Sequence, residues 1–62
     1  MFIRLVGLDD EGNEFNMYLN MERIDFTIDE EKAVTMSDGV VRLTDDSYEY
    51  LTAFLKQTWF ED

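Results

Sequence analysis

The stretch TDDSYEYLTAFLKQTWF, residues 44–60, decides the fold because a helical repeat replaces the alternating pattern that precedes it. At about 100° per residue, one apolar stripe falls within an arc of roughly 80°. Its members are Tyr48, Leu51, Leu55 and Trp59. Thr44 suits the N-cap position, and Asp45 and Asp46 place negative charge in the first turn, where the helix dipole favours it. The stretch predicts a helix over about residues 45–60 that packs this stripe on the rest of the chain.

Three further aromatic side chains of the same stretch lie off this stripe. Tyr50 and Phe54 lie roughly 100–160° from its centre, and Phe60 points to a third side. One interpretation is a wide apolar arc that curls around a small sheet, with Phe60 folding back as a cap. The other is an exposed apolar patch of Tyr50, Phe54 and Phe60 that meets a partner protein or a second copy of the chain.

Upstream of the helix, short runs alternate between apolar and polar side chains, which is typical of strands. The runs are FIRLVGL (2–8), EFNMYL (14–19), IDFTI (24–28), AVTM (33–36) and VVRL (40–43). The segments between them read as turns, and we expect positive φ at Gly39 and at Gly12 or Asn13. The alternation groups Ile3, Leu5 and Gly7 on one face of the first run, and Phe15, Met17 and Leu19 on one side of the second. In the third run it predicts that Ile24, Phe26 and Ile28 face inward.

Together these patterns predict an α+β fold. We expect a small antiparallel, barrel-like β-meander of four or five strands within residues 1–43, followed by the C-terminal helix. The 62 residues form one domain, and a chain of this length buries only about 60% of its unfolded surface. It has no cysteine, so no disulfide supplements the core.

The charge is strongly negative, with fifteen Asp and Glu against five Lys and Arg and a formal net charge of −10. Such a protein is repelled by phosphate groups, so we expect no direct binding to nucleic acid or to anionic lipid. The N-terminus lacks the features of a signal peptide, and no apolar run reaches about 18 residues. The expected compartment is the cytoplasm.

The residue types argue against catalysis. The chain has neither histidine nor cysteine, so it lacks the usual general base and the common nucleophile pairs. The segment GLDDEGNE fails as a calcium loop, because Gly7 occupies its first position and Tyr18 the position of the bidentate Glu. We expect no enzyme activity, no cofactor and no dedicated metal site; weak divalent-cation binding by the 9–14 turn is the alternative.

The acidic residues are the strongest functional signal, and they occur in three clusters. These clusters are Asp9, Asp10, Glu11 and Glu14; Asp29, Glu30 and Glu31; and Asp45, Asp46 and Glu49. One hypothesis is that they only keep an aromatic-rich domain soluble. The other is that they form a face complementary to a basic protein, and mimic the phosphates of DNA if that partner binds nucleic acid. Short acidic anti-defence proteins of phages are of this type.

The order of motifs also resembles a known family. The segments GNEFNMYLN, ERIDFTI, AVTMSDG and DSYEYL resemble the small flagellar accessory proteins of the FlbD/SwrD type and similar short phage or mobile-element proteins. The matching positions are Phe15, Tyr18, Leu19, Asn20, Glu22, Ile24, Val34, Thr35, Gly39, Ser47 and Glu49. The resemblance covers most of the chain and implies a β-meander with a C-terminal helix and a non-enzymatic, partner-dependent role.

Two functional hypotheses follow. The first is an acidic inhibitor or adaptor that docks on a basic partner protein. The second is an accessory protein of the FlbD type that acts through the apolar helix patch or as a homodimer. Steep loss of binding with salt is expected only for the first.

Overall fold

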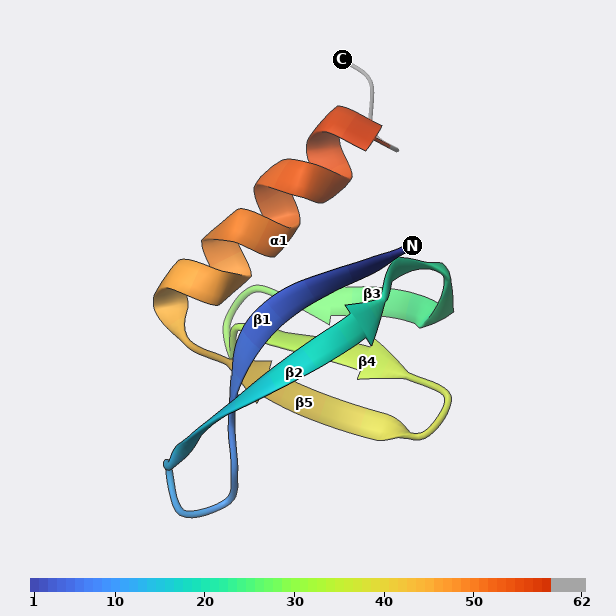
Figure 1. The fold of residues 1–62 in the computed structure, drawn as a ribbon. Helices are drawn as coiled ribbons and strands as arrows, with labels where there is room; N and C mark the ends of the chain where they lie inside the picture. Colours follow the sequence, from blue (N-terminus) through green and yellow to red (C-terminus); the bar gives the residue numbers. More distant parts are fainter. Residues whose placement is uncertain (59–62) are drawn as a thin grey trace.

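The fold is a five-stranded antiparallel sheet with one helix packed against it, in a computed structural model that describes residues 1–58 (Figure 1). The strands are β1 (Phe2–Leu8), β2 (Glu14–Asn20), β3 (Ile24–Ile28), β4 (Ala33–Met36) and β5 (Gly39–Leu43). A short 3-10 helix, η1 (Met21–Arg23), precedes β3, and α1 (Asp45–Thr58) follows β5. The strand order is β2-β1-β5-β4-β3. The predicted α+β class and the predicted strand positions are confirmed.

The predicted turns are also present. The β1–β2 turn is closed by a hydrogen bond from the Asp9 amide to the Asn13 carbonyl, and Gly12 adopts a φ of 85°. The Asp9 carboxylate accepts bonds from two amides of the same turn, those of Glu11 and Asn13. Gly39 follows the two-residue β4–β5 loop with a φ of 144°, so both glycines occupy backbone conformations that other residues rarely adopt.

The prediction of a barrel-like β-meander is wrong in two respects, because the sheet is not closed and its strands are not neighbours in chain order throughout, with β1 beside β5. Strands β2 and β3 are the two edges of the sheet rather than neighbours. The chain between them turns through η1, where Asn20 Oδ1 accepts from the Glu22 amide and the Met21 amide donates to the Met1 carbonyl. This connection continues the β1–β2 pairing and then redirects the chain, so it does not fold β3 back onto β2 as a hairpin would.

The inward position predicted for Phe26 is wrong as well. Between two successive pairs, β3 advances by two residues, from Ile24 to Phe26, while β4 advances by only one. The extra residue in β3 is a β-bulge. Strict alternation fails at such a bulge, so Thr27 faces the core beside Val34 while Phe26 turns outward and is 59% exposed. Ile28 lies on the same face as Phe26 by alternation, but it is half-buried and opposite the buried Ala33, so the inward position predicted for it is met only in part.

The core lies between the sheet and α1. Tyr48, Leu51 and Leu55 form the buried stripe of the helix, as predicted, while Trp59 lies outside the described residues. The stripe packs on buried residues of the strands and of η1, namely Ile3, Leu5, Leu19, Met21, Val34 and Leu43. Thr44 caps the helix as expected, since its Oγ1 accepts from the Ser47 amide at 3.3 Å.

The helix also joins the two halves of the sheet. Strands β1 and β5 share only two opposed pairs, Gly7–Leu43 and Leu8–Arg42. Beyond them, the Thr44 amide donates to the Val6 carbonyl at 3.1 Å, and the Val6 amide donates to Ser47 Oγ at 2.9 Å. The segment at the start of α1 therefore extends the short contact between β1 and β5, which we call the seam.

Candidate acidic docking surface

The strand register places the three acidic clusters at one end of the sheet. A single row of directly opposed residues runs across all five strands, and it consists of Glu14, Leu8, Arg42, Ala33 and Ile28. Neighbouring strands lie about 4.8 Å apart, so the row spans roughly 20 Å. Every acidic cluster begins on this row or a few residues beyond it.

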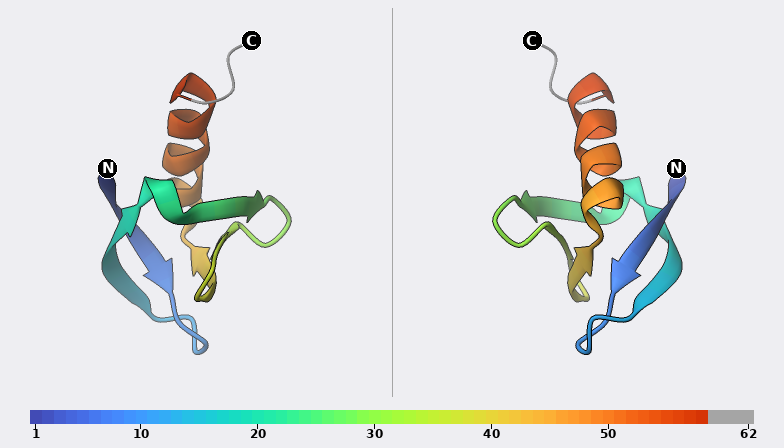
Figure 2. Two further views of the ribbon diagram at one scale, coloured as in Figure 1. Left: turned by 90° about the vertical axis from the view of Figure 1, so that its right-hand side faces the viewer. Right: turned by 90° about the vertical axis from the view of Figure 1, so that its left-hand side faces the viewer.

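The first cluster follows Leu8 in the β1–β2 turn and ends at Glu14 on the row. The second forms the β3–β4 turn between Ile28 and Ala33, and the third starts α1 just after β5. Figure 2 (right) looks onto this end, with the β1–β2 turn at the bottom, the β3–β4 turn at one side and the first turn of α1 above the β1–β2 turn. All ten predicted residues are exposed: Asp9, Asp10, Glu11, Glu14, Asp29, Glu30, Glu31, Asp45, Asp46 and Glu49. We call these ten residues the acidic end.

Most of the net charge of the protein lies here. The acidic end carries ten carboxylates, and only two cations, Lys32 and Arg42, lie among them. The resulting charge of −8 leaves −2 for the rest of a chain whose total is −10. Within residues 1–58, the one ion pair is between the Met1 amino group and Glu22, at 3.8 Å and at the other end of the sheet. The carboxylates of the acidic end therefore retain their attraction for an external cation.

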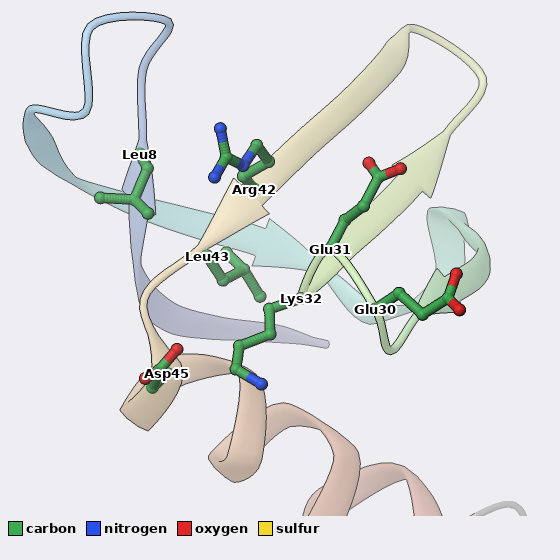
Figure 3. A pocket seen from close by; sticks show the side chains of 7 residues that line it. All are labelled: Leu8, Glu30, Glu31, Lys32, Arg42, Leu43 and Asp45. Carbon is green, nitrogen blue, oxygen red and sulfur yellow. The ribbon is translucent and has the colours of Figure 1, made fainter.

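A hollow of about 490 Å³ lies in the middle of the acidic end (Figure 3). Its lining combines the ends of two strands, the β3–β4 turn and the first residue of α1: Leu8, Glu30, Glu31, Lys32, Arg42, Leu43 and Asp45. In Figure 3 the Lys32 side chain extends toward the start of α1, whereas Arg42 lies on the other side of Leu43. No sequence pattern links these two cations, because Arg42 is 10 residues from Lys32 and only the register brings them to one hollow.

Lys32 has an unusual backbone. Its φ is 52°, in the left-handed region that costs a residue with a Cβ roughly 1–2 kcal/mol. The conformation closes the β3–β4 turn, since the Lys32 amide donates to the Asp29 carbonyl and the Lys32 carbonyl accepts from the Leu43 amide at 2.9 Å. Glycine or asparagine would fit such a position with less strain, so the sequence DEEK gives no sign of this turn geometry.

The acidic end is tied to the core through Tyr48. The hydroxyl of this buried tyrosine donates to Asp29 Oδ1 in the β3–β4 turn. Burial raises the pKa of the Tyr48 phenol above its usual value of 10.0, and the hydrogen bond to Asp29 and the negative charge of Asp29 raise it further, while a hydrogen bond with Thr27 acts in the opposite direction. The phenol thus fixes one carboxylate of the acidic end relative to the sheet.

This arrangement predicts a loss of stability at alkaline pH. The folded state holds the Tyr48 proton more tightly than the unfolded state, so the stabilisation is fully present below about pH 10 and falls as the pH rises toward the higher pKa of the folded state. Urea unfolding measured from neutral pH to above pH 10 should show this fall. The fall in the free energy of unfolding should be smaller in Tyr48→Phe. An equal fall in both proteins would show that ionisation of Tyr48 is not its cause.

The predicted apolar patch is only partly exposed. Tyr50 is 57% exposed, but Phe54 is half-buried and packs against the core, while Phe60 lies outside the described residues. The structure therefore places Phe54 with the wide apolar arc rather than wholly in the patch. Whether Tyr50 contacts another molecule stays a prediction.

A second exposed apolar region was not identified as a site from the sequence. Met1, Phe2 and Tyr18 are 56%, 64% and 72% exposed, and all lie on the β1–β2 hairpin or at its start. The signal was available in the alternation, which places Phe2 and Tyr18 at outward positions. No helix among the described residues has the length and hydropathy needed to cross a membrane. Residues 1–58 also contain no group of three acidic side chains arranged to hold a metal ion.

Comparison of the chain with protein families, curated proteins and solved structures found no match. The resemblance to flagellar accessory proteins stays a prediction.

Proposed function

We propose that this protein is a non-enzymatic, acidic binding module that docks its acidic end on a basic surface of a partner protein. The observation that supports this proposal is the row across the sheet, which brings three acidic clusters that are distant in sequence to one end of the molecule. A role in solubility alone would require no such gathering, since scattered charges serve that purpose.

The binding mechanism is electrostatic. The carboxylates of the acidic end lie on or just beyond the row that spans roughly 20 Å, and they meet lysine and arginine side chains of the partner. The charge speeds the encounter and fixes its orientation, while Lys32 and Arg42 in the central hollow each offer a site for a carboxylate of the partner. An inhibitor or adaptor role in the cytoplasm, acting as a DNA mimic on a nucleic-acid-binding partner, is the form of this function that we favour.

Two charge-reversal variants test the proposal. In the first, Asp10, Glu31 and Glu49 of the acidic end are changed to lysine. In the matched control, Glu22, Asp25 and Asp38 at the other end of the sheet are changed to lysine. Three reversals add six charges, so both variants have a net charge of −4 instead of −10.

The immobilised protein is incubated with a soluble extract of the cells from which it comes, and proteins retained at low salt are identified and their affinities measured. We expect a basic protein whose affinity falls roughly tenfold or more at high salt and is lost in the acidic-end variant, but largely kept in the control. If both variants lose affinity equally, net charge alone explains the binding, and the acidic end is not a specific docking surface. Salt-tolerant binding that Tyr50→Ala abolishes would instead support the apolar-patch hypothesis.

A further inference from the structure

Among the strands of residues 1–58, β2 lies at the edge of the sheet and has a regular outer edge that pairs with no other strand. The two ends of the β1–β2 ladder fix its hydrogen-bonding phase, because the Asp9 amide bonds to the Asn13 carbonyl and the Met21 amide bonds to the Met1 carbonyl. In an antiparallel pair of strands, every second residue forms hydrogen bonds to the partner strand. Because Asn13 and Met21 form such bonds, the odd-numbered residues of β2 bond to β1. The amides and carbonyls of Glu14, Asn16, Tyr18 and Asn20 therefore point away from β1, toward the free edge.

The other edge of the sheet is protected and β2 is not. Strand β3 has five residues, contains the bulge and carries Asp25, and these are features that discourage pairing with another chain. Strand β2 has seven residues in continuous register with β1, with no bulge, no proline and no lysine or arginine. Glu14, at its first position, is its one charged residue. An edge of this kind is a template for a further strand.

The inward face of β2 is also incompletely covered within the monomer. Leu19 is buried and Met17 half-buried, but Phe15 is 42% exposed although it lies on the same face. Its ring lies across Gly7, where an added Cβ would come within 2.7 Å of the Phe15 Cζ atom. The core covers one end of this apolar face and leaves Phe15 at the edge of the sheet.

We propose that the occupant of this edge is the β2 strand of a second copy of the chain, paired antiparallel about Met17. This register uses all seven residues of each strand. It places Asn16 opposite Tyr18 of the second copy, and the amides of both residues point to the shared edge, as antiparallel hydrogen bonding requires. It places Phe15 opposite Leu19 and Met17 opposite Met17 on the inward face. The apolar face that stops at Phe15 then continues into the second copy and buries that ring.

The charges are compatible with this pairing despite the net charge of each chain. Glu14 lies opposite the neutral Asn20, so no like charges face each other along the strands. Because the pairing is antiparallel, the two acidic ends lie at opposite ends of the joined strands. Seven residues at about 3.4 Å separate the two Glu14 positions by roughly 20 Å, well beyond the Debye length of about 8 Å at physiological salt. This inference does not depend on the proposed function, and it leaves both acidic ends accessible.

The test compares two substitutions at Asn16. Asn16→Pro removes an amide hydrogen that points to the free edge and leaves the bonds to β1 in place, whereas Asn16→Thr keeps that hydrogen. In light-scattering and sedimentation measurements across a concentration series, we expect the unmodified protein and Asn16→Thr to approach twice the 7.4 kDa chain mass. Asn16→Pro should remain at the monomer mass with an unchanged far-ultraviolet circular dichroism spectrum. The dimer should persist or strengthen at high salt, because salt screens the repulsion between the chains.

Amide hydrogen exchange gives a second measurement that does not rely on the proline variant folding. The amides of Asn16 and Tyr18 should become protected as the protein concentration rises, while the Met17 amide, which bonds to β1, should be protected throughout. A protein that remains monomeric, with rapid exchange at Asn16 and Tyr18 at every concentration, would overturn the proposal. The proposal would also be overturned if the protein is monomeric and Asn16→Pro abolishes its binding to a different protein. In that case β2 would pair with a strand of that other protein.

Discussion

Replacement of Leu51 by alanine is expected to leave most of the protein unfolded at physiological temperature. Leu51 is fully buried at the centre of the helical stripe, between Tyr48 and Leu55. Truncating a buried leucine to alanine costs about 2–5 kcal/mol, through lost apolar burial and the cavity left behind. A single core in a chain of this size supplies only roughly 3–5 kcal/mol, so one such change removes most or all of the stability.

Urea unfolding followed by circular dichroism measures this effect, with Gln57→Ala as the control. Gln57 lies on the same helix but is exposed, so its replacement should change the free energy of unfolding by less than about 0.5 kcal/mol. A Leu51→Ala protein as stable as the control would mean that α1 does not complete the core.

Replacement of Ser47 by alanine is expected to lower the free energy of unfolding by about 1–2 kcal/mol. The change removes the oxygen that accepts from the Val6 amide at 2.9 Å and leaves that partly buried donor without its partner. Alanine is the better helix former by about 0.5 kcal/mol, which offsets part of the loss. The effect is significant because β1 and β5 share only two opposed pairs at this seam.

Ser37→Ala is the matched control, since Ser37 and Ser47 are the chain's two serines and Ser37 is exposed in the β4–β5 loop. Urea unfolding should separate the two variants, and amide hydrogen exchange should be faster at Val6 in Ser47→Ala alone. If the Val6 amide exchanges at the same rate in both variants, the serine hydroxyl is not what closes the seam.

The sequence predicted the fold well where local rules apply. The stripe of Tyr48, Leu51 and Leu55 follows from helical spacing, and the glycine positions follow from turn chemistry. Phe26 was assigned to the wrong face because a bulge adds one residue to the period, and no residue type marks that bulge in IDFTI. The open sheet was missed because strand spacing is the same whether or not the edge strands meet.

The candidate site shows a similar division. The acidic residues and their exposure could be read from composition and turn position. The position of all three acidic clusters at one end of the sheet could not be predicted from the sequence. It depends on the pairing of Leu8 with Arg42 and of Arg42 with Ala33, which joins distant segments. Lys32 and Arg42 were missed for the same reason.

The bond from the Val6 amide to Ser47 has a consequence for biosynthesis. Val6 emerges from the ribosome 41 residues before the serine that satisfies it, which is roughly 2–8 s at typical rates of translation. During that interval the β1–β2 hairpin has no helix above it, and a two-stranded hairpin is only marginally stable in water. The nascent chain should therefore be open to proteases and chaperones until the start of α1 has been made.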